Sequence, residues 1–124
     1  METNQHHPIS HGCIVKLKES FLNEPIGTLA YVYENYSLGE GRWNGVSLIT
    51  ENGVDLGGFS EREQVDYLEA ISQTGYRYRF INMIQLGEDY EKGVFTDVFE
   101  KIKNTLDLIY KGIEQAGEYI QKNY

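Results

Sequence analysis

The 124-residue chain contains one cysteine and two prolines, and all three of its histidines lie within the first eleven residues. A single cysteine, Cys13, cannot form an internal disulfide, so a disulfide-stapled scaffold is excluded and an oxidising compartment is not indicated. No apolar run approaches the roughly 20 residues that a membrane-spanning helix requires, and residues 1–7 lack the basic start and apolar stretch of a secretory signal. We therefore expect a cytoplasmic protein without a membrane segment.

Positive charge is scarce as well. Eleven lysines and arginines stand against nineteen aspartates and glutamates, which gives a formal net charge of −8. Non-specific binding to nucleic acid or to an anionic membrane requires net positive charge at the contact, so neither is expected as a partner. The length suffices for one domain with its own core.

The position of the histidines also limits catalysis. No imidazole base is available after His11, so nucleophile activation by histidine would depend on a polar N-terminal segment. His7, His11 and Cys13 do not match the spacing of a closed four-ligand zinc site. The carboxylates of residues 88–91 are predicted to lie in a solvated loop, where they would not form a catalytic pair. We therefore predict a non-enzymatic protein that uses neither a cofactor nor a metal.

Alternating residue types predict two β-strands, over residues 13–19 and 28–36. In the first, Cys13, Val15 and Leu17 share one face, which we expect to be buried while the opposite face meets solvent. The second is rich in strand-forming aromatic and branched residues. Both are therefore expected in one sheet.

A hairpin is predicted after a glycine-rich loop over residues 37–45. Residues 46–50 alternate in polarity, and Asn52-Gly53 is typical of a two-residue type I′ turn, which needs two positive φ angles. The second strand of this hairpin is expected to stop at Gly57-Gly58.

Two helices and one further strand are expected beyond the hairpin. Ser60 and Glu63 form a capping box at the start of a helix predicted over residues 61–72. Aromatic and branched residues predict a strand over 76–84, and apolar spacings of four and three predict a long helix over 94–122. The apolar stripe of that helix consists of Phe95, Phe99, Ile102, Leu106, Ile109, Ile113, Ala116 and Ile120.

Together these elements predict a flexible polar tail over residues 1–11 and a single α+β domain over 12–124, sheet-rich from 12 to 92. The expected fold is a small, bent antiparallel sheet of about five strands with a short inserted helix and a long C-terminal helix over one face. In strand spacing, the first 58 residues resemble an SH3-like partial barrel, a likeness that implies no particular ligand. Packing of the last helix on its own sheet and homo-oligomer formation through its stripe both stay open.

Aromatic residues provide the first functional hypothesis. Tyr31 and Tyr33 share one strand face, and Tyr76 and Tyr78 share another, so a bent sheet could bring them together with Trp43 closing over them from its loop. Rows of tyrosine tend to lie where a sheet meets another molecule. We predict a non-enzymatic acidic binding protein that inhibits or neutralises a protein partner. Because electrostatic steering attracts opposite charges, we expect this partner to be basic.

Arginines near these aromatics provide an alternative. Guanidinium and aromatic planes can together hold a phosphorylated, nucleotide-like small molecule, which the protein would sequester or sense. For each residue taken singly, tyrosines in the core and arginines paired with carboxylates are the commoner arrangement. The predicted binding residues of the two hypotheses are Tyr31, Tyr33, Arg42, Trp43, Tyr76, Arg77, Tyr78 and Arg79.

Overall fold

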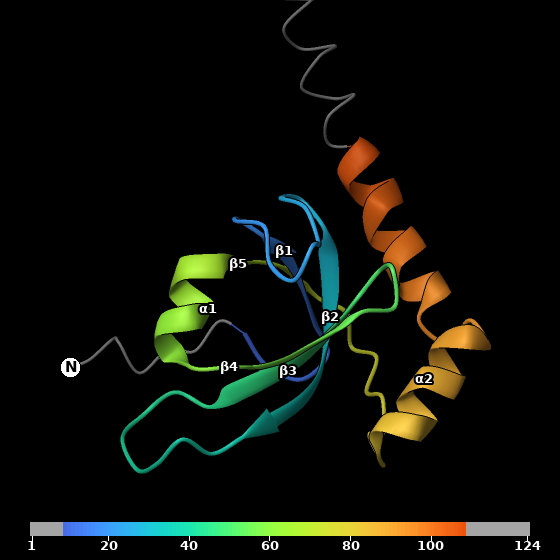
Figure 1. The fold of residues 1–124 in the computed structure, drawn as a ribbon. Helices are drawn as coiled ribbons and strands as arrows, with labels where there is room; N and C mark the ends of the chain where they lie inside the picture. The colour runs from blue at the N-terminus through green and yellow to red at the C-terminus, as the bar shows by residue number, and fades with distance from the viewer. Residues whose placement is uncertain (1–8, 109–124) are drawn as a thin grey trace, which may run out of the picture.

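The computed structural model describes residues 9–108, so most of the predicted tail, and the predicted helix from residue 109 onward, lie outside the described residues. Five strands form one antiparallel sheet in the order β4-β3-β2-β1-β5 (Figure 1). The predicted α+β class and antiparallel sheet are confirmed. The sheet is not closed, so the SH3-like partial barrel is not confirmed. The strands are β1 (Cys13–Leu17), β2 (Leu29–Tyr36), β3 (Gly45–Thr50), β4 (Asp55–Phe59) and β5 (Leu68–Gln73).

The helices lie on opposite sides of this sheet (Figure 1). Helix α1 (Glu61–Tyr67) connects β4 to β5 on one side, and α2 (Met83–Glu91) lies on the other. A helical segment over residues 96–108, called the C-terminal helix below, follows α2 on that same side. Residues 74–82, called the β5–α2 linker, form neither helix nor strand. No described helix is both long enough and apolar enough to cross a membrane.

Strand alternation gives the sheet two buried faces, each with its own core. The α1-side core consists of Ile9, Cys13, Val15, Leu17, Ala30, Val32, Val46, Leu48, Leu56, Phe59 and Leu68. The helix-side core consists of Ile14, Leu29, Tyr31, Tyr33, Ile49, Tyr78, Leu86, Phe95, Phe99 and Ile102. Successive residues of a strand point to opposite faces, which is why neighbours such as Ile14 and Val15 belong to different cores.

Burial on both faces corrects the prediction for the first strand. Ile14 has no exposed surface, although it lies on the face expected to meet solvent. Lys16, on that same face, is half-buried and its ammonium lies 3.8 Å from the carboxylate of Glu69. The prediction was wrong because α2 and the C-terminal helix, which are distant in the sequence, cover this face.

The predicted hairpin is confirmed, but its turn is of another type. The N–H of Thr50 donates to the carbonyl oxygen of Val54 and the N–H of Gly53 donates to that of Thr50, both at 2.9 Å, which closes a three-residue loop. Within this loop only Gly53 has a positive φ, of 84°. A type I′ turn needs two such residues, so this hairpin instead belongs to the three-residue class, in which a single left-handed residue ends the loop.

The capping box is confirmed, whereas the predicted length of its helix is wrong. The hydroxyl of Ser60 accepts from the N–H of Glu63, and the Glu63 carboxylate accepts from the N–H of Ser60. The helix predicted over 61–72 ends at Tyr67, because the chain becomes extended at Leu68 and pairs with β1 as β5. Pairing with the open edge of the sheet at β1 therefore outweighs the helical spacing of the apolar residues.

Two other boundaries differ from the predictions. Strand β4 continues through 57–58 to its end at Phe59. The strand predicted over 76–84 does not form, because those residues belong to the linker and to the start of α2. The side-chain oxygen of Asn82 accepts from the N–H of Gln85 at 2.8 Å and caps α2.

The described end of the predicted tail is packed against the domain. Ile9 is only 3% exposed and belongs to the α1-side core. The carbonyl oxygen of Ser10 accepts from the N–H of Cys13 at 2.9 Å. One apolar residue in a polar run produces no periodicity, so the sequence pattern did not indicate this packing.

Candidate functional site

Three of the predicted binding residues are buried in the helix-side core. Tyr31, Tyr33 and Tyr78 are 0%, 3% and 5% exposed, because α2, the C-terminal helix and the linker cover their face of the sheet. Tyr33 donates its hydroxyl to Asp55 at 2.9 Å, and burial together with that carboxylate raises the pKa of Tyr33. Burial likewise raises the pKa of Tyr31. In this arrangement these side chains hold the core together and a partner cannot reach them.

Trp43 does not close over the tyrosines, as the sequence had suggested. It lies beside α1, where it lines a shallow hollow together with Glu61, Arg62, Val65 and Asp66. Arg42 in the same loop donates from Nε to the Glu61 carboxylate at 2.6 Å. Because α1 and the tyrosine core lie on opposite sides of the sheet, the structure does not bring these two groups together (Figure 1).

The remaining predicted residues lie on the β5–α2 linker. Arg77 and Arg79 are exposed, and Arg77 donates from Nη1 to the carbonyl oxygen of His11 at 2.8 Å. Tyr76 is half-buried and its ring packs at the edge of the helix-side core. Tyr76 also lines a second hollow, which is larger than the one beside Trp43.

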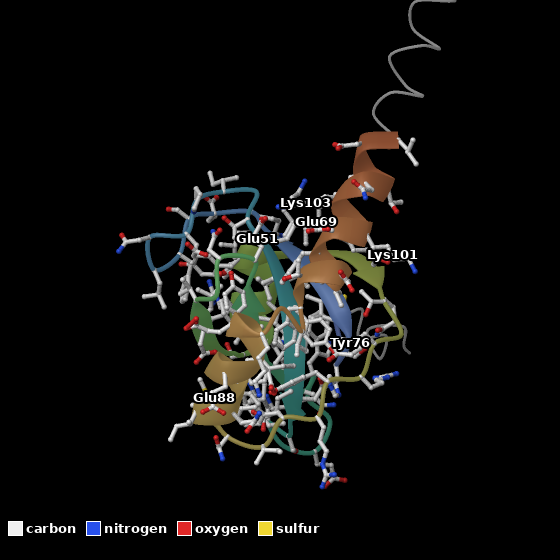
Figure 2. The ribbon with its side chains drawn as sticks, turned by 90° about the vertical axis from the view of Figure 1, so that its right-hand side faces the viewer. Glu51, Glu69, Tyr76, Glu88, Lys101 and Lys103 are labelled. Carbon is white, nitrogen blue, oxygen red and sulfur yellow. The ribbon has the colours of Figure 1, made fainter. Side chains whose placement is uncertain are left out.

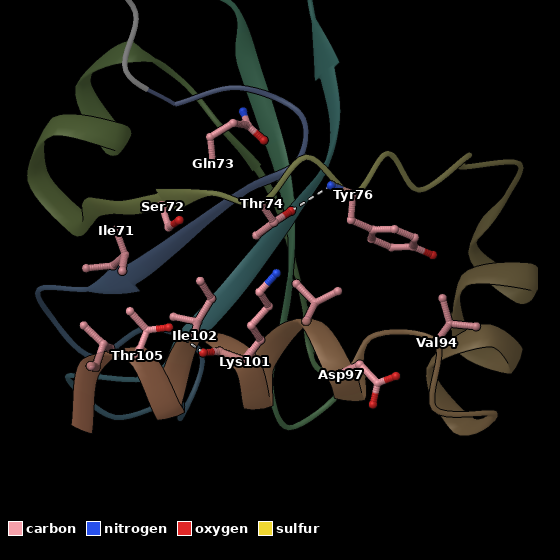
Figure 3. A pocket seen from close by; sticks show the side chains of 12 residues that line it. Ile71, Ser72, Gln73, Thr74, Tyr76, Val94, Asp97, Lys101, Ile102 and Thr105 are labelled. Atoms are coloured by element: carbon pink, nitrogen blue, oxygen red, sulfur yellow. Dashed lines mark hydrogen bonds between the residues drawn. The ribbon is translucent and has the colours of Figure 1, made fainter. Parts of the chain in front are cut away.

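That larger hollow is a cavity of about 560 Å³ between β5, the linker and the C-terminal helix (Figure 3). Its walls are mainly apolar. The polar residues that line it are Ser72, Gln73, Thr74, Asp97, Lys101 and Thr105. The apolar walls come from Ile71, Tyr76, Val94, Val98, Ile102 and Leu106.

A bulge in β5 builds one wall of this cavity. In the pairing of β1 with β5, Val15 lies opposite Ala70 and Ile14 lies opposite Ser72, which leaves Ile71 as an extra residue. A bulge breaks the alternation of side chains between the two faces. As a result, the neighbours Ile71 and Ser72 both line the cavity.

The C-terminal helix builds the opposite wall through its spacing. Val98 lies three and four residues before Lys101 and Ile102, and Thr105 lies four and three residues after them, which places these residues along one side of the helix. Val94, which also lines the cavity, precedes the helix. The most buried residues of the predicted apolar stripe thus pack in the helix-side core, and residues at the edge of the stripe line the cavity.

Lys101 is the cation of this wall. Its side chain extends from the C-terminal helix across the cavity toward β5 and the linker, whereas the carboxylate of Asp97, one turn earlier, points away from it (Figure 3). Among the described residues, the Lys101 ammonium has no hydrogen-bond or ion-pair partner. Lys103 differs: it forms an ion pair with Glu51 on the other side of the helix (Figure 2).

The sequence interpretation missed Ser72, Thr74, Asp97 and Lys101. Asp97 and Lys101 border the apolar stripe, and this position was the one available signal for them. The opposite wall was not foreseeable, because residues 68–73 were expected to be helical and their bulge exists only through pairing with β1.

Neither a metal centre nor an activated thiol is formed within residues 9–108. No three histidine, cysteine, aspartate or glutamate side chains in that range group closely enough to hold a metal ion. Cys13 is buried, and this burial raises the pKa of its thiol, which keeps it in the unreactive protonated form.

Comparison with protein-family models, curated proteins and solved structures finds no match for this chain.

Proposed function

We propose that this protein is a non-enzymatic binding protein whose ligand is a small, largely apolar molecule held between β5 and the C-terminal helix. The observation that carries the proposal is the cavity of about 560 Å³ with its mainly apolar walls. Ligand pockets commonly measure roughly 300–1,000 Å³ and combine apolar walls with a few polar groups. Burial of an apolar ligand there would contribute the hydrophobic free energy of binding.

The polar groups at the cavity favour binding over catalysis. Thr74 donates its hydroxyl to the carbonyl oxygen of Gly12 at 2.8 Å and accepts from the N–H of Tyr76 at 3.1 Å. Thr105 donates its hydroxyl to the carbonyl oxygen of Lys101 at 2.9 Å. These hydroxyls are engaged by the backbone, and no described histidine or cysteine lines the cavity to activate a nucleophile.

This proposal modifies both hypotheses from the sequence. A protein partner on the tyrosine face is disfavoured because that face is covered by helices. A small-molecule ligand is retained, but the arginines expected to hold a phosphate lie elsewhere: Arg42 pairs with Glu61 and Arg77 bonds to His11. Tyr76 is the residue that the nucleotide hypothesis and the cavity share.

A neutral fluorescent probe, N-phenyl-1-naphthylamine, tests the proposal without involving charge. We expect saturable binding to the full chain with one site. Val98→Phe and Thr105→Phe fill the cavity and should each weaken binding at least tenfold. Glu100→Phe places the same side chain on the same helix away from the cavity and should leave the affinity unchanged. Circular dichroism establishes that each variant is folded, and equal affinities in all four proteins would refute the cavity as the site.

A second candidate function, contact with a basic protein, is favoured by a separate surface. At the start of α2, Ile81, Met83 and Ile84 are 63%, 48% and 77% exposed, and a cluster of exposed apolar side chains is typical of interaction sites. The net charge of −8 would steer a basic partner toward the protein. Biolayer interferometry against a basic nuclease should show weaker binding for Ile84→Ser than for Val65→Ser, which alters an exposed apolar residue on α1. Equal binding by both variants would contradict this candidate.

A further inference from the structure

Resting on the proposed function, we propose that the cavity selects ligands with a single carboxylate, whose negative charge pairs with the ammonium of Lys101. The proposed function specifies where the ligand binds and that its body is apolar, and the charge of the ligand is the new element.

The orientation of Lys101 is the first observation behind this inference. An aspartate placed four residues before a lysine on a helix commonly pairs with it. Here Asp97 and Lys101 have this spacing, yet their side chains diverge and Lys101 reaches across the cavity (Figure 3). Its methylene stem can lie along the apolar wall while its ammonium stays at the border. Lys101 is exposed at this border, so its ammonium is accessible to an anion that binds there.

The surroundings of Lys101 favour a carboxylate over a phosphate. Phosphate sites usually combine arginine forks, backbone N–H groups or a helix N-terminus, so that several donors share the charge. Among the described lining residues Lys101 is the one cationic side chain, and Asp97, one helical turn earlier, adds a negative charge to the lining. The hydroxyls of Thr74 and Thr105 already donate to backbone oxygens. A single ammonium, with an aspartate in the same lining, therefore suits a monoanion better than a dianion.

The apolar walls determine what must follow the carboxylate. Ile102 follows Lys101 directly along the chain, and Leu106 lies one turn further along the same wall, while Ile71 faces them from β5. A ligand with its carboxylate at Lys101 would therefore place an alkyl or aryl body between these side chains. This fits a medium-chain fatty acid or a comparable aryl carboxylate.

A matched series of ligands tests the inference. Decanoate, decanamide and decyl phosphate share an alkyl body and differ in the head group. By isothermal titration calorimetry on the full chain, we expect decanoate to bind at least tenfold more tightly than the other two, since one charge-assisted hydrogen bond makes about that difference. The preference should shrink as ionic strength rises, because Lys101 lies at the solvent border.

Variants on the C-terminal helix assign the preference to Lys101. Lys101→Gln should remove the advantage of decanoate over decanamide. Lys103→Gln, the matched control, removes a lysine that pairs with Glu51 outside the cavity and should keep the advantage. Asp97→Asn should raise the affinity for decyl phosphate relative to decanoate.

The outcomes separate this inference from the proposed function. Equal affinities for decanoate and decanamide in the unmodified protein would overturn the carboxylate inference and leave the apolar cavity site standing. Tighter binding of decyl phosphate would overturn the choice of a monoanion. Loss of the decanoate advantage in Lys103→Gln as well would show a general charge effect and overturn the role of Lys101. Failure of all three ligands and of the neutral probe to bind would refute the proposed function itself.

Discussion

The hydroxyl of Tyr31 donates a hydrogen bond to the carbonyl oxygen of Tyr76 at 2.7 Å. The same hydroxyl accepts from the N–H of Tyr78 at 3.0 Å. One buried side chain of β2 thereby fixes two backbone groups of the β5–α2 linker. Because Tyr76 lines the cavity, this contact also sets the position of a cavity wall.

Tyr31→Phe should destabilise the protein by about 1–3 kcal/mol, because it leaves the N–H of Tyr78 and the carbonyl of Tyr76 without their partner in a buried environment. Tyr36→Phe, which removes the hydroxyl of a tyrosine that is 37% exposed, serves as the control and should change stability by less than about 0.5 kcal/mol. Urea denaturation measures both. A Tyr31→Phe variant as stable as the control would contradict the structural role of this hydroxyl.

Ile9→Ala should cost roughly 2–5 kcal/mol of unfolding free energy, the usual range for truncating a buried isoleucine. The matched change Ile26→Ala affects a side chain that is 65% exposed and should have little effect. Thermal melts of the two variants compare them directly. If both variants melted together with the unmodified protein, Ile9 would not belong to the α1-side core.

Stability should fall in acid partly through Asp89, which lies on α2 and not in the solvated loop expected from the sequence. A hydrogen bond from Tyr78, at 2.6 Å, holds the pKa of Asp89 below its ordinary value of 3.8, and a second comes from Gln85 at 2.9 Å. Because the pKa of Asp89 is lower in the folded protein than in the unfolded chain, its ionised form stabilises the fold at pH values above the unfolded-state pKa. This contribution is lost as the pH falls below about 4 and through the pKa of the folded state.

The test of this acid dependence is a series of thermal melts between pH 7 and pH 2. Tyr78→Phe keeps the ring but removes the hydrogen bond, so the loss of melting temperature below pH 4 should be smaller than in the unmodified protein. Identical pH profiles would show that the Tyr78 hydroxyl does not act on the Asp89 carboxylate.

Gly53→Ala should destabilise the hairpin more than Gly57→Ala does. Both glycines have a positive φ, of 84° and 78°, so each substitution incurs backbone strain of roughly 1–3 kcal/mol. A Cβ on Gly53 would in addition lie 2.6 Å from Cε1 of Tyr90, whereas a Cβ on Gly57 would meet nothing within 4 Å. Chemical denaturation of the two variants isolates the Tyr90 contact, and equal losses would contradict it.

Features that depend on neighbouring residues alone were predictable from the sequence. Ser60 and Glu63 satisfy each other's backbone donors within one helical turn, so the start of α1 followed from four consecutive residues. Gly53 similarly marked the β3–β4 turn, although the number of left-handed residues in it was misjudged. Alternation in β1 and β2 identified both strands and assigned Cys13 correctly to the interior.

Tertiary structure decided the features for which local signals conflicted. Leu68 and Ile71 suit a helix and a strand equally well, and the unpaired edge of β1 selected the strand and created the bulge at the cavity. Tyr31 and Tyr78 are as compatible with a binding surface as with a core, and the return of α2 and the C-terminal helix over their face buried them. The cavity beside Lys101 exists only because residues about 30 positions apart meet there. Local patterns determined the first strands, the helix cap and the β3–β4 turn, whereas long-range packing determined β5 and the side chains that line the cavity.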